Sequence, residues 1–319
     1  MRTAEPAVTS ERPDVSVVVP VRDAVRDIEV TLSTLLGQQG PTLEVVAVDD
    51  GSGDGTLDVL RRLAAADPRL RVVAQAASGI TAALIAGCGA ARGRLIARQD
   101  AGGTSALPGR LARPAALLDA SPEVVLASCG VRWLTPGGET LDDEIQDAAD
   151  ADAGLRRLDV RTIRGPTHHA STMFRRSDYE AVGGYRAVFR FAQDLDLWLR
   201  LAERGRHVVV PEVLTVRTLR ASGTSAWMAR WQRDLAEQAI QAAHLRAAGH
   251  DEQPALDAAA AISARVPRRP TRSQRAQASY HVGCRLRRRY PREARVHFSE
   301  AWRLAPWDVR PLIRLWSTR

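Results

Sequence analysis

The chain has 319 residues, of which 45% are apolar, and it carries a formal net charge of +8. This apolar content is ordinary for a globular protein and too high for a wholly disordered one. Lysine is absent, so all 45 basic residues are arginines, whose planar guanidinium can bind a phosphate or a carboxylate through two hydrogen bonds. The three cysteines lie far apart in the sequence, which excludes a cysteine-rich metal site and argues for a reducing compartment.

The N-terminus and the charge distribution bear on domain organisation. Residues 1–13 contain no apolar stretch typical of a signal peptide, and we expect them to be a disordered lead-in. No apolar run approaches the ~20 residues of a membrane-spanning helix, so we expect a cytoplasmic protein. Residues 265–319 hold 15 arginines and only three acidic residues, whereas the rest of the chain is net negative. This asymmetry indicates two functional parts.

The first third of the chain alternates between short apolar runs and amphipathic segments. Strands are predicted at residues 15–19, 43–48, 70–73 and 95–97, and helices at 24–38, 56–66 and 80–91. Such alternation predicts a doubly wound α/β sheet, in which ligands bind beyond the carboxyl ends of the strands. Four residues lie at these strand ends, namely Pro20, Asp49, Asp50 and Asp100.

The remainder of the chain divides into a mixed segment and a helical one. Short strands are expected at 124–128, 170–174, 207–210 and 213–218, a helix at 194–204, and a solvated loop or frayed helix over the acidic stretch 142–152. Helices are predicted near 225–248, 254–264, 272–288, 292–304 and 307–316, with prolines between several of them. We therefore predict an α/β domain over 14–221 and an arginine-rich helical region over 222–319.

A glycine-rich acidic turn, VDDGSGDGT, spans residues 48–56 and admits several interpretations. Its glycine spacing does not match a dinucleotide fingerprint, and its aspartates would repel a pyrophosphate. As a calcium loop it has Arg61 where a bidentate glutamate is needed. The remaining alternatives are a strand-end carboxylate that accepts a hydrogen bond from a nucleoside, or a helix-capping turn without a ligand.

Four motifs in order resemble the inverting family 2 glycosyltransferases of the GT-A fold. They are VSVVVPVRD, LEVVAVDDGSGDGT, LIARQDAGG and QDLDLWLRL, and the resemblance covers roughly residues 14–220. It implies a mixed, mainly parallel sheet flanked by helices. It also implies transfer of a sugar from a nucleoside diphosphate sugar to a hydroxyl acceptor whose identity the sequence does not give.

The resemblance implies a donor site at the strand ends. Pro20 and Asp50, with Asp49 beside it, correspond to the nucleoside contacts. Asp100 corresponds to the first carboxylate of an Asp-x-Asp motif that binds a divalent cation, Mg²⁺ or Mn²⁺, on the diphosphate. Gly102 stands where the second carboxylate would be, so the cation is expected to be held weakly. Arg98 can then offset part of the diphosphate charge.

The resemblance also implies a catalytic base and an acceptor side. Asp194 corresponds to the base that takes the proton of the acceptor hydroxyl, and an N-cap role is equally compatible with its position. Gln193 replaces the glutamate that usually precedes this aspartate. His168 and His169 lie in a segment that often borders the acceptor site in the family, where we expect one of them to have a supporting role.

Two other classes of function remain open at the level of sequence. The changes at Gly102, Gly103 and Gln193 are compatible with a catalytically impaired, binding-only relative of the same fold. The arginine-rich C-terminal region is compatible with a surface that binds anionic membranes or nucleic acid. Because that region also carries a regular apolar pattern, we expect peripheral contact with an anionic membrane and no specific nucleic-acid partner.

Overall fold

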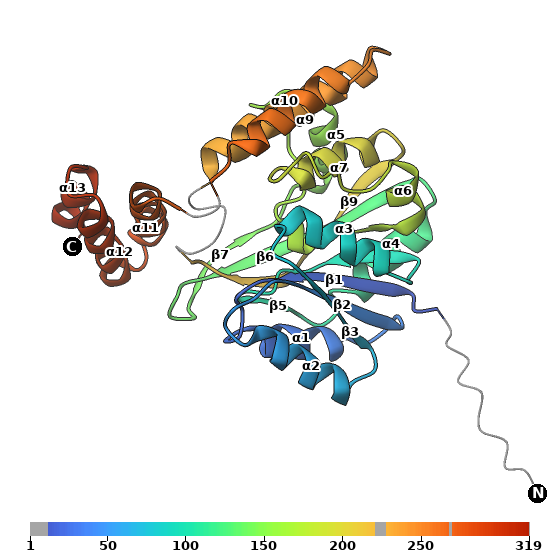
Figure 1. The fold of residues 1–319 in the computed structure, drawn as a ribbon, viewed down its shortest axis with the longest axis horizontal. Coiled ribbons are helices and arrows are strands. Elements are labelled where there is room, and N and C mark those ends of the chain that lie inside the picture. The colour runs from blue at the N-terminus through green and yellow to red at the C-terminus, as the bar shows by residue number, and fades with distance from the viewer. Residues whose placement is uncertain (1–11, 221–227, 268–269, 319) are drawn as a thin grey trace, which may run out of the picture.

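A computed structural model describes residues 12–220, 228–267 and 270–318 of the chain. The predicted lead-in over 1–13 lies almost wholly outside these residues, and so does the predicted boundary at 221/222. The described residues form one mixed sheet of nine strands with helices on both faces (Figure 1). The predicted architecture, a mixed sheet flanked by helices and followed by C-terminal helices, is confirmed.

The sheet has the strand order β3-β2-β1-β4-β8-β6-β9-β5, with β7 paired to β6. Pairs among β1, β2, β3 and β4 are parallel, β8 runs antiparallel to both neighbours, and β6 and β9 are parallel. The strands are β1 (Val15–Val21), β2 (Leu43–Asp50), β3 (Leu70–Gln75), β4 (Leu95–Arg98), β5 (Thr104–Ala106), β6 (Val124–Leu134), β7 (Thr140–Glu144), β8 (Met173–Arg175) and β9 (Arg206–Thr218).

Helices cover both faces of the sheet and form the C-terminal region. Those of the first part are α1 (Ile28–Leu36), α2 (Thr56–Ala66), α3 (Ile80–Ala90), α4 (Ala112–Ala120), α5 (Ala148–Arg156), the 3₁₀ turn η1 (His169–Ser171), α6 (Arg176–Ala181) and α7 (Gln193–Ala202). The later helices are α9 (Ala229–Ala247), α10 (Gln253–Ala264), α11 (Arg272–Leu286), α12 (Pro291–Leu304) and α13 (Arg310–Ser317).

Two predicted segments are wrong in part. The acidic stretch 142–152, expected to be a solvated loop or a frayed helix, is largely exposed, but its first residues form part of β7, where Asp143 pairs with Arg132 of β6. Its later residues begin α5, which is capped by the Asp147 side chain and buries Leu155. The strand expected at 170–174 is instead η1 followed by the short β8, and the two strands expected between 207 and 218 are one continuous β9.

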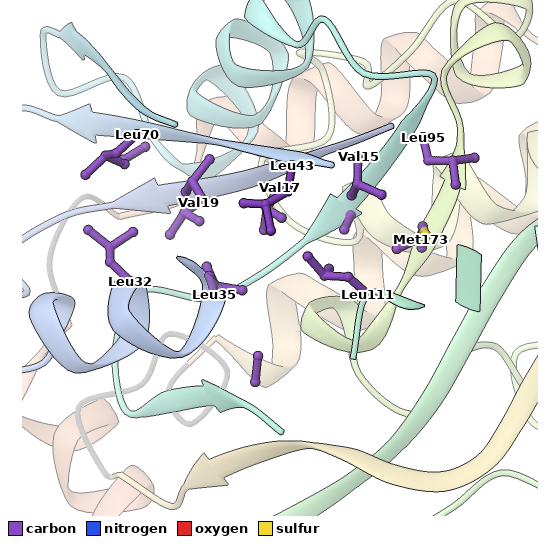
Figure 2. Packing of buried hydrophobic residues seen from close by; sticks show 14 of the residues in the cluster. Val15, Val17, Val19, Leu32, Leu35, Leu43, Leu70, Leu95, Leu111 and Met173 are labelled. Carbon is purple, nitrogen blue, oxygen red and sulfur yellow. The ribbon is translucent and has the colours of Figure 1, made fainter. Parts of the chain in front are cut away.

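Alternation along the central strands separates two buried layers. One layer joins alternate residues of β1, β2 and β4, such as Val17 and Leu95, to Leu32 and Leu35 of α1 (Figure 2). The intervening residues, such as Val18 and Ile96, face α3 and α7. Since neighbouring residues of a strand point to opposite faces, Pro20, Asp50 and Arg98 lie on the α3–α7 face and Asp49 on the α1–α2 face.

The C-terminal helices pack in two separate groups. Phe189, Phe191 and Leu199 share a buried core with Leu235 and other residues of α9 and α10, so these two helices are packed against α7. The group formed by α11, α12 and α13 lies apart, next to the β6–β7 hairpin (Figure 1). None of the helices in the described part is long and apolar enough to span a membrane.

One buried carboxylate joins three neighbouring strands to the loop after α3, at the end of the sheet opposite the strand-end residues. Glu44 on β2 is only 2% exposed and accepts hydrogen bonds from Ser16 Oγ (2.6 Å), Arg92 N (2.7 Å) and Arg71 (3.0 Å). Burial alone would raise the pKa of Glu44, but these donors hold it below the ordinary value of 4.5. The carboxylate therefore stabilises the fold above about pH 4.5, and this contribution is lost as the pH falls through the lowered pKa.

We expect Glu44→Gln to lower the free energy of unfolding at pH 7 by about 1–3 kcal/mol, because a charged hydrogen-bond acceptor is lost from a buried site. The difference from the unsubstituted protein should shrink as the pH falls below about 4. Urea denaturation between pH 3.5 and 7 measures both, with Asp58→Asn as the control because the Asp58 side chain is 86% exposed. A constant difference across that pH range would contradict the assignment.

Candidate active site

The site is organised around the carboxylate of Asp100, which follows the end of β4. Its Oδ1 accepts a hydrogen bond from Arg98, and its Oδ2 accepts one from Arg217 of β9 at 2.6 Å. Burial opposes ionisation of Asp100, but the two guanidinium charges outweigh it and hold its pKa well below the ordinary value. Asp100 is therefore ionised at any physiological pH and is paired with two arginines.

His168 completes this cluster, and it is neutral. Its Nδ1 accepts hydrogen bonds from Ala170 N (3.0 Å) and from Arg217 (3.1 Å), which assigns the ring proton to Nε2, 3.8 Å from Asp100 Oδ2. Burial and the Arg217 charge lower the pKa of His168 to about 3. His168 thus holds Arg217 through a hydrogen bond and adds no positive charge to the cluster.

The neighbouring His169 faces a different part of the site. Its Nε2 lies 2.8 Å from the hydroxyl of Tyr185, and its ring meets the edge of Trp198 on α7 at a centroid distance of 5.9 Å. Burial lowers the pKa of His169 well below its ordinary value, so this ring is also neutral. The two histidines, expected together on the acceptor side, therefore contact different groups.

Asp194 lies in the first turn of α7, on the face of the sheet that carries Arg98. The N-cap residue of this helix is Ala192, so the N-cap role expected as one alternative for Asp194 is wrong. Its Oδ1 accepts a hydrogen bond from Leu195 N at 2.9 Å. Burial raises the pKa of Asp194, while the charges of Arg98 and Asp100 act on it in opposite directions. A carboxylate with a raised pKa beside a cationic cluster has the properties of a general base.

The glycine-rich turn holds Asp50 against the beginning of α3. The Asp50 carboxylate accepts hydrogen bonds from Gln75 Nε2 (2.8 Å), Ser78 N (2.7 Å) and Gly79 N (2.8 Å). Two of these donors are backbone N–H groups, whereas the Gln75 amide belongs to a side chain. An N–H or hydroxyl group of a nucleoside can therefore replace the Gln75 amide as a donor to Asp50. Asp49 Oδ1, on the other face of the sheet, is buried and has no hydrogen-bond partner among the described residues.

Further buried polar atoms around the site lack partners within the described part of the chain. Both side-chain polar atoms of Gln99, Oε1 of Gln193 and Nε of Arg98 are in this state. Buried polar groups are nearly always hydrogen-bonded in folded proteins. Their concentration around Asp100 and the start of α7 is expected where a polar ligand completes the hydrogen bonding.

Arg110 connects the segments that carry these residues. It is 1% exposed, and its guanidinium donates to the carbonyl oxygens of Arg98 (3.1 Å), Ala170 (3.0 Å) and Thr172 (3.0 Å). Burial lowers the pKa of Arg110. This side chain fixes the end of β4 relative to η1 and thereby positions the Asp100 cluster.

The residues at Asp100 do not fit a cation held by the protein. The position of a second carboxylate is Gly102, and both Asp100 oxygens already accept arginine donors. Within the described ranges, no group of three or more His, Cys, Asp or Glu side chains is arranged to hold a metal ion. A divalent cation at Asp100 would displace a guanidinium and lie beside two positive charges.

Two residues of this site were missed by the sequence analysis. Arg217 is a single basic residue in an apolar strand, and Arg110 lies in an arginine-containing loop that resembles exposed surface. Both act through contacts with residues distant in the sequence. The one local signal for a site residue was at Arg217, which is a charged residue within a strand expected to be buried.

The fold is shared with known sugar transferases. The chain aligns with the structure of the mannosyltransferase PcManGT from Pyrobaculum calidifontis, in complex with GDP-Man and Mn²⁺, over 97% of this chain and 80% of that one. The TM-score is 0.57 at 23% sequence identity. This similarity defines the chain as a GT-A-type fold.

The family follows from sequence. The model of glycosyl transferase family 2 matches residues 16–182, which is just over half of the chain. The protein therefore belongs to glycosyl transferase family 2 and is a glycosyltransferase. The matched span ends before Asp194 and Arg217, so their roles rest on the geometry described above.

Curated relatives agree with this assignment. EpsE of Bacillus subtilis (strain 168), named as a glycosyltransferase, is 28% identical over 197 residues, which is 60% of this chain and 68% of EpsE. The succinoglycan biosynthesis protein ExoO of Rhizobium meliloti (strain 1021) is 39% identical over 117 residues, or 36% of this chain. The alignment spans only 33% of ExoO.

We expect Arg110→Met to destabilise the protein by about 2–5 kcal/mol, because three buried carbonyl oxygens lose their shared donor. Urea denaturation at pH 7 measures the change. Arg113→Met is the control, since Arg113 is 62% exposed and lies 3.5 Å from an exposed partner, Glu212. Equal unfolding free energies for the two variants would show that Arg110 does not connect these segments.

Proposed function

We propose that the protein is an inverting glycosyltransferase that uses a nucleoside diphosphate sugar as donor and a hydroxyl group as acceptor. The observation that carries this proposal is the position of Asp194, a carboxylate of raised pKa beside the Arg98–Asp100–Arg217 cluster. Asp194 and the arginine cluster lie on the same face of the sheet. A sugar ring bound between them would have the base on the side of the acceptor and the arginines on the side of the diphosphate.

The proposed reaction is a single displacement at the anomeric carbon. Asp194 takes the proton of the acceptor hydroxyl while that oxygen forms a bond to C1. The bond between C1 and the diphosphate oxygen breaks, and its electron pair leaves with the nucleoside diphosphate. Because attack and departure occur on opposite faces, the anomeric configuration inverts, and no covalent sugar–enzyme intermediate forms.

The donor's nucleoside is proposed to lie at the ends of β1 and β2. Pro20 and Asp50 lie on the same face as Arg98, and Asp50 can exchange its Gln75 donor for a nucleoside N–H or hydroxyl. Asp49 supports the turn from the other face through Ser52 N (3.2 Å). The GDP-mannose bound to the structural neighbour PcManGT supports a sugar nucleotide as donor.

The acceptor is proposed to approach the side of the site bounded by α7. His169, Gln193 and Tyr185 offer polar atoms there, and Oε1 of Gln193 has no partner among the described residues. An acceptor hydroxyl group, which both donates and accepts hydrogen bonds, suits this set. Because residue 193 is a glutamine and not a glutamate, Asp194 has no second negative charge immediately before it.

We expect Asp194→Asn to lower kcat by about 100- to 10,000-fold with donor affinity retained, because the amide cannot take the hydroxyl proton. The kcat of the unsubstituted enzyme should rise with pH through a midpoint above the ordinary aspartate value of 3.8, since burial raises this pKa. Donor-hydrolysis or transfer assays in a panel of sugar nucleotides measure the rate, and calorimetry with GDP and UDP measures binding.

Glu203→Gln serves as the control for this experiment, since it removes an exposed carboxylate just after the same helix. Full activity of Asp194→Asn would exclude Asp194 as the base. Absence of binding to every nucleotide and sugar nucleotide tried would overturn the proposed function itself.

A second role is favoured by the surface of α13 and of the residues just before it. Trp316 is 82% exposed and Trp307 68% exposed, and Ile313 and Trp316 line a shallow hollow with Leu312. Arg310 and Arg314 lie on the same short helix. We propose that this surface docks on an anionic bilayer, because exposed tryptophans favour the bilayer interface and the surrounding region is rich in arginine.

We expect the full chain to sediment with vesicles of phosphatidylglycerol and phosphatidylcholine and to leave pure phosphatidylcholine vesicles in suspension. Trp316→Gln should weaken binding about 10-fold, since one large apolar side chain is no longer buried. Val30→Gln is the control, because Val30 is an exposed apolar residue on α1. Equal sedimentation of Trp316→Gln and the unsubstituted chain would contradict docking through this face.

A further inference from the structure

The Asp100 cluster has more positive charge than its single carboxylate balances. Arg98 and Arg217 both donate to Asp100, and the neighbouring His168 is neutral. Asp194, on which the charges of Arg98 and Asp100 act, is assigned to the acceptor by the proposed reaction. Two guanidiniums directed at one carboxylate retain several N–H donors, and Nε of Arg98 is buried without a partner among the described residues.

Both guanidiniums are held in place before any ligand binds. Arg98 is only 2% exposed, on β4. Arg217 lies with its guanidinium carbon 5.3 Å from the centre of the Trp133 ring, which also contacts Arg285 of α11 at 4.5 Å. Asp100 holds the two arginines together. Little conformational entropy therefore remains to be lost when an anion binds.

The backbone beside Asp100 is open on the side where a second carboxylate would stand. A Cβ atom built at Gly102 meets no atom within 4 Å, whereas one at Gly103 would lie 3.0 Å from Nε of Arg220. Arg220 pairs with Asp27 at 2.6 Å. Asp27 balances the charge of Arg220, whereas Arg98 and Arg217 share the single carboxylate of Asp100. The excess positive charge at residues 98–103 therefore comes from Arg98 and Arg217, and it attracts a phosphate and repels a cation.

We infer that Arg98 and Arg217 bind the diphosphate of the donor directly and supply the charge neutralisation for which a divalent cation would otherwise be needed. Asp100 is then a positioning residue for the two guanidiniums and not a metal ligand. This inference rests on the proposed function, because it concerns the leaving group of that reaction. When the bond between C1 and oxygen breaks, the departing electron pair is stabilised by the arginine N–H donors, which keep their protons.

Calorimetry on the full chain tests the inference with inorganic pyrophosphate, GDP and UDP as titrants. Each is titrated in excess EDTA and again with MnCl₂. We expect pyrophosphate and at least one nucleotide to bind in EDTA, with affinities changed less than about 3-fold by Mn²⁺. Binding that occurs only with Mn²⁺ would overturn the inference while leaving the proposed function intact. Absence of nucleotide binding under both conditions would instead overturn the proposed function.

Single substitutions test which side chains bind pyrophosphate. Arg217→Gln should weaken pyrophosphate binding in EDTA by about 10- to 100-fold, since one charge-assisted contact is lost. Arg132→Gln is the matched control. Arg132 is next to Trp133 on β6, points to the opposite face of the strand and pairs with Asp143 at 2.7 Å. Equal affinities for Arg217→Gln and Arg132→Gln would contradict the assignment.

Two further measurements do not depend on the folding of an arginine variant. Paramagnetic resonance of Mn²⁺ should show no uptake by the unsubstituted chain beyond that of Asp100→Asn, and uptake that is lost in Asp100→Asn would identify Asp100 as a metal ligand. Gly102→Asp should lower the metal-free affinity for pyrophosphate about 10-fold relative to Gly102→Ala, because the added carboxylate repels the phosphates. Equal affinities for these two variants would place the diphosphate elsewhere.

Discussion

The paired hydrogen bonds from Arg98 and Arg217 to the Asp100 carboxylate are the interaction on which the rest of the site depends. Arg98 ends β4, in the parallel part of the sheet, and Arg217 lies on β9, three strands further across it. One carboxylate thus joins the parallel part of the sheet to the mixed part. It also sets the local charge, because a single negative group between two guanidiniums leaves a net positive region.

The sheet itself determines which residues can act together. Strand alternation turns Pro20, Asp50 and Arg98 toward α3 and α7, and the start of α7 brings Asp194 to the same face. Burial then raises the pKa of Asp194, while the arginines lower that of Asp100. Two aspartates in one site are thereby given different properties, one suited to proton transfer and the other to permanent pairing.

Local patterns in the sequence were sufficient for much of this structure. The apolar runs ending in Asp50 and near Asp100 predicted the parallel strands, and the helical spacing before and after the glycine-rich turn predicted α1 and α2. These elements depend on residues close together in the chain. The position of Asp194 on a helix was predicted for the same reason, although its site role stays a proposal.

What the sequence did not reveal depends on contacts between distant residues. Arg217 acquires its role from the pairing of β6 with β9 and from Asp100, which is 117 positions away. Arg110 acquires its role from carbonyl groups at the end of β4 and in the segment 170–172. The strand β7 was missed within the acidic stretch 142–152 because its partners Arg132 and Trp133 in β6 were not identifiable from local pattern.

The most direct test of this account is a crystal structure of the full chain with GDP or UDP, grown in the presence of Mn²⁺. We expect oxygens of the diphosphate to lie within hydrogen-bond distance of Arg98 and Arg217, with the Asp100 carboxylate still hydrogen-bonded to both guanidiniums. An Mn²⁺ ion coordinated by Asp100 and the diphosphate, with Arg217 turned away, would contradict it.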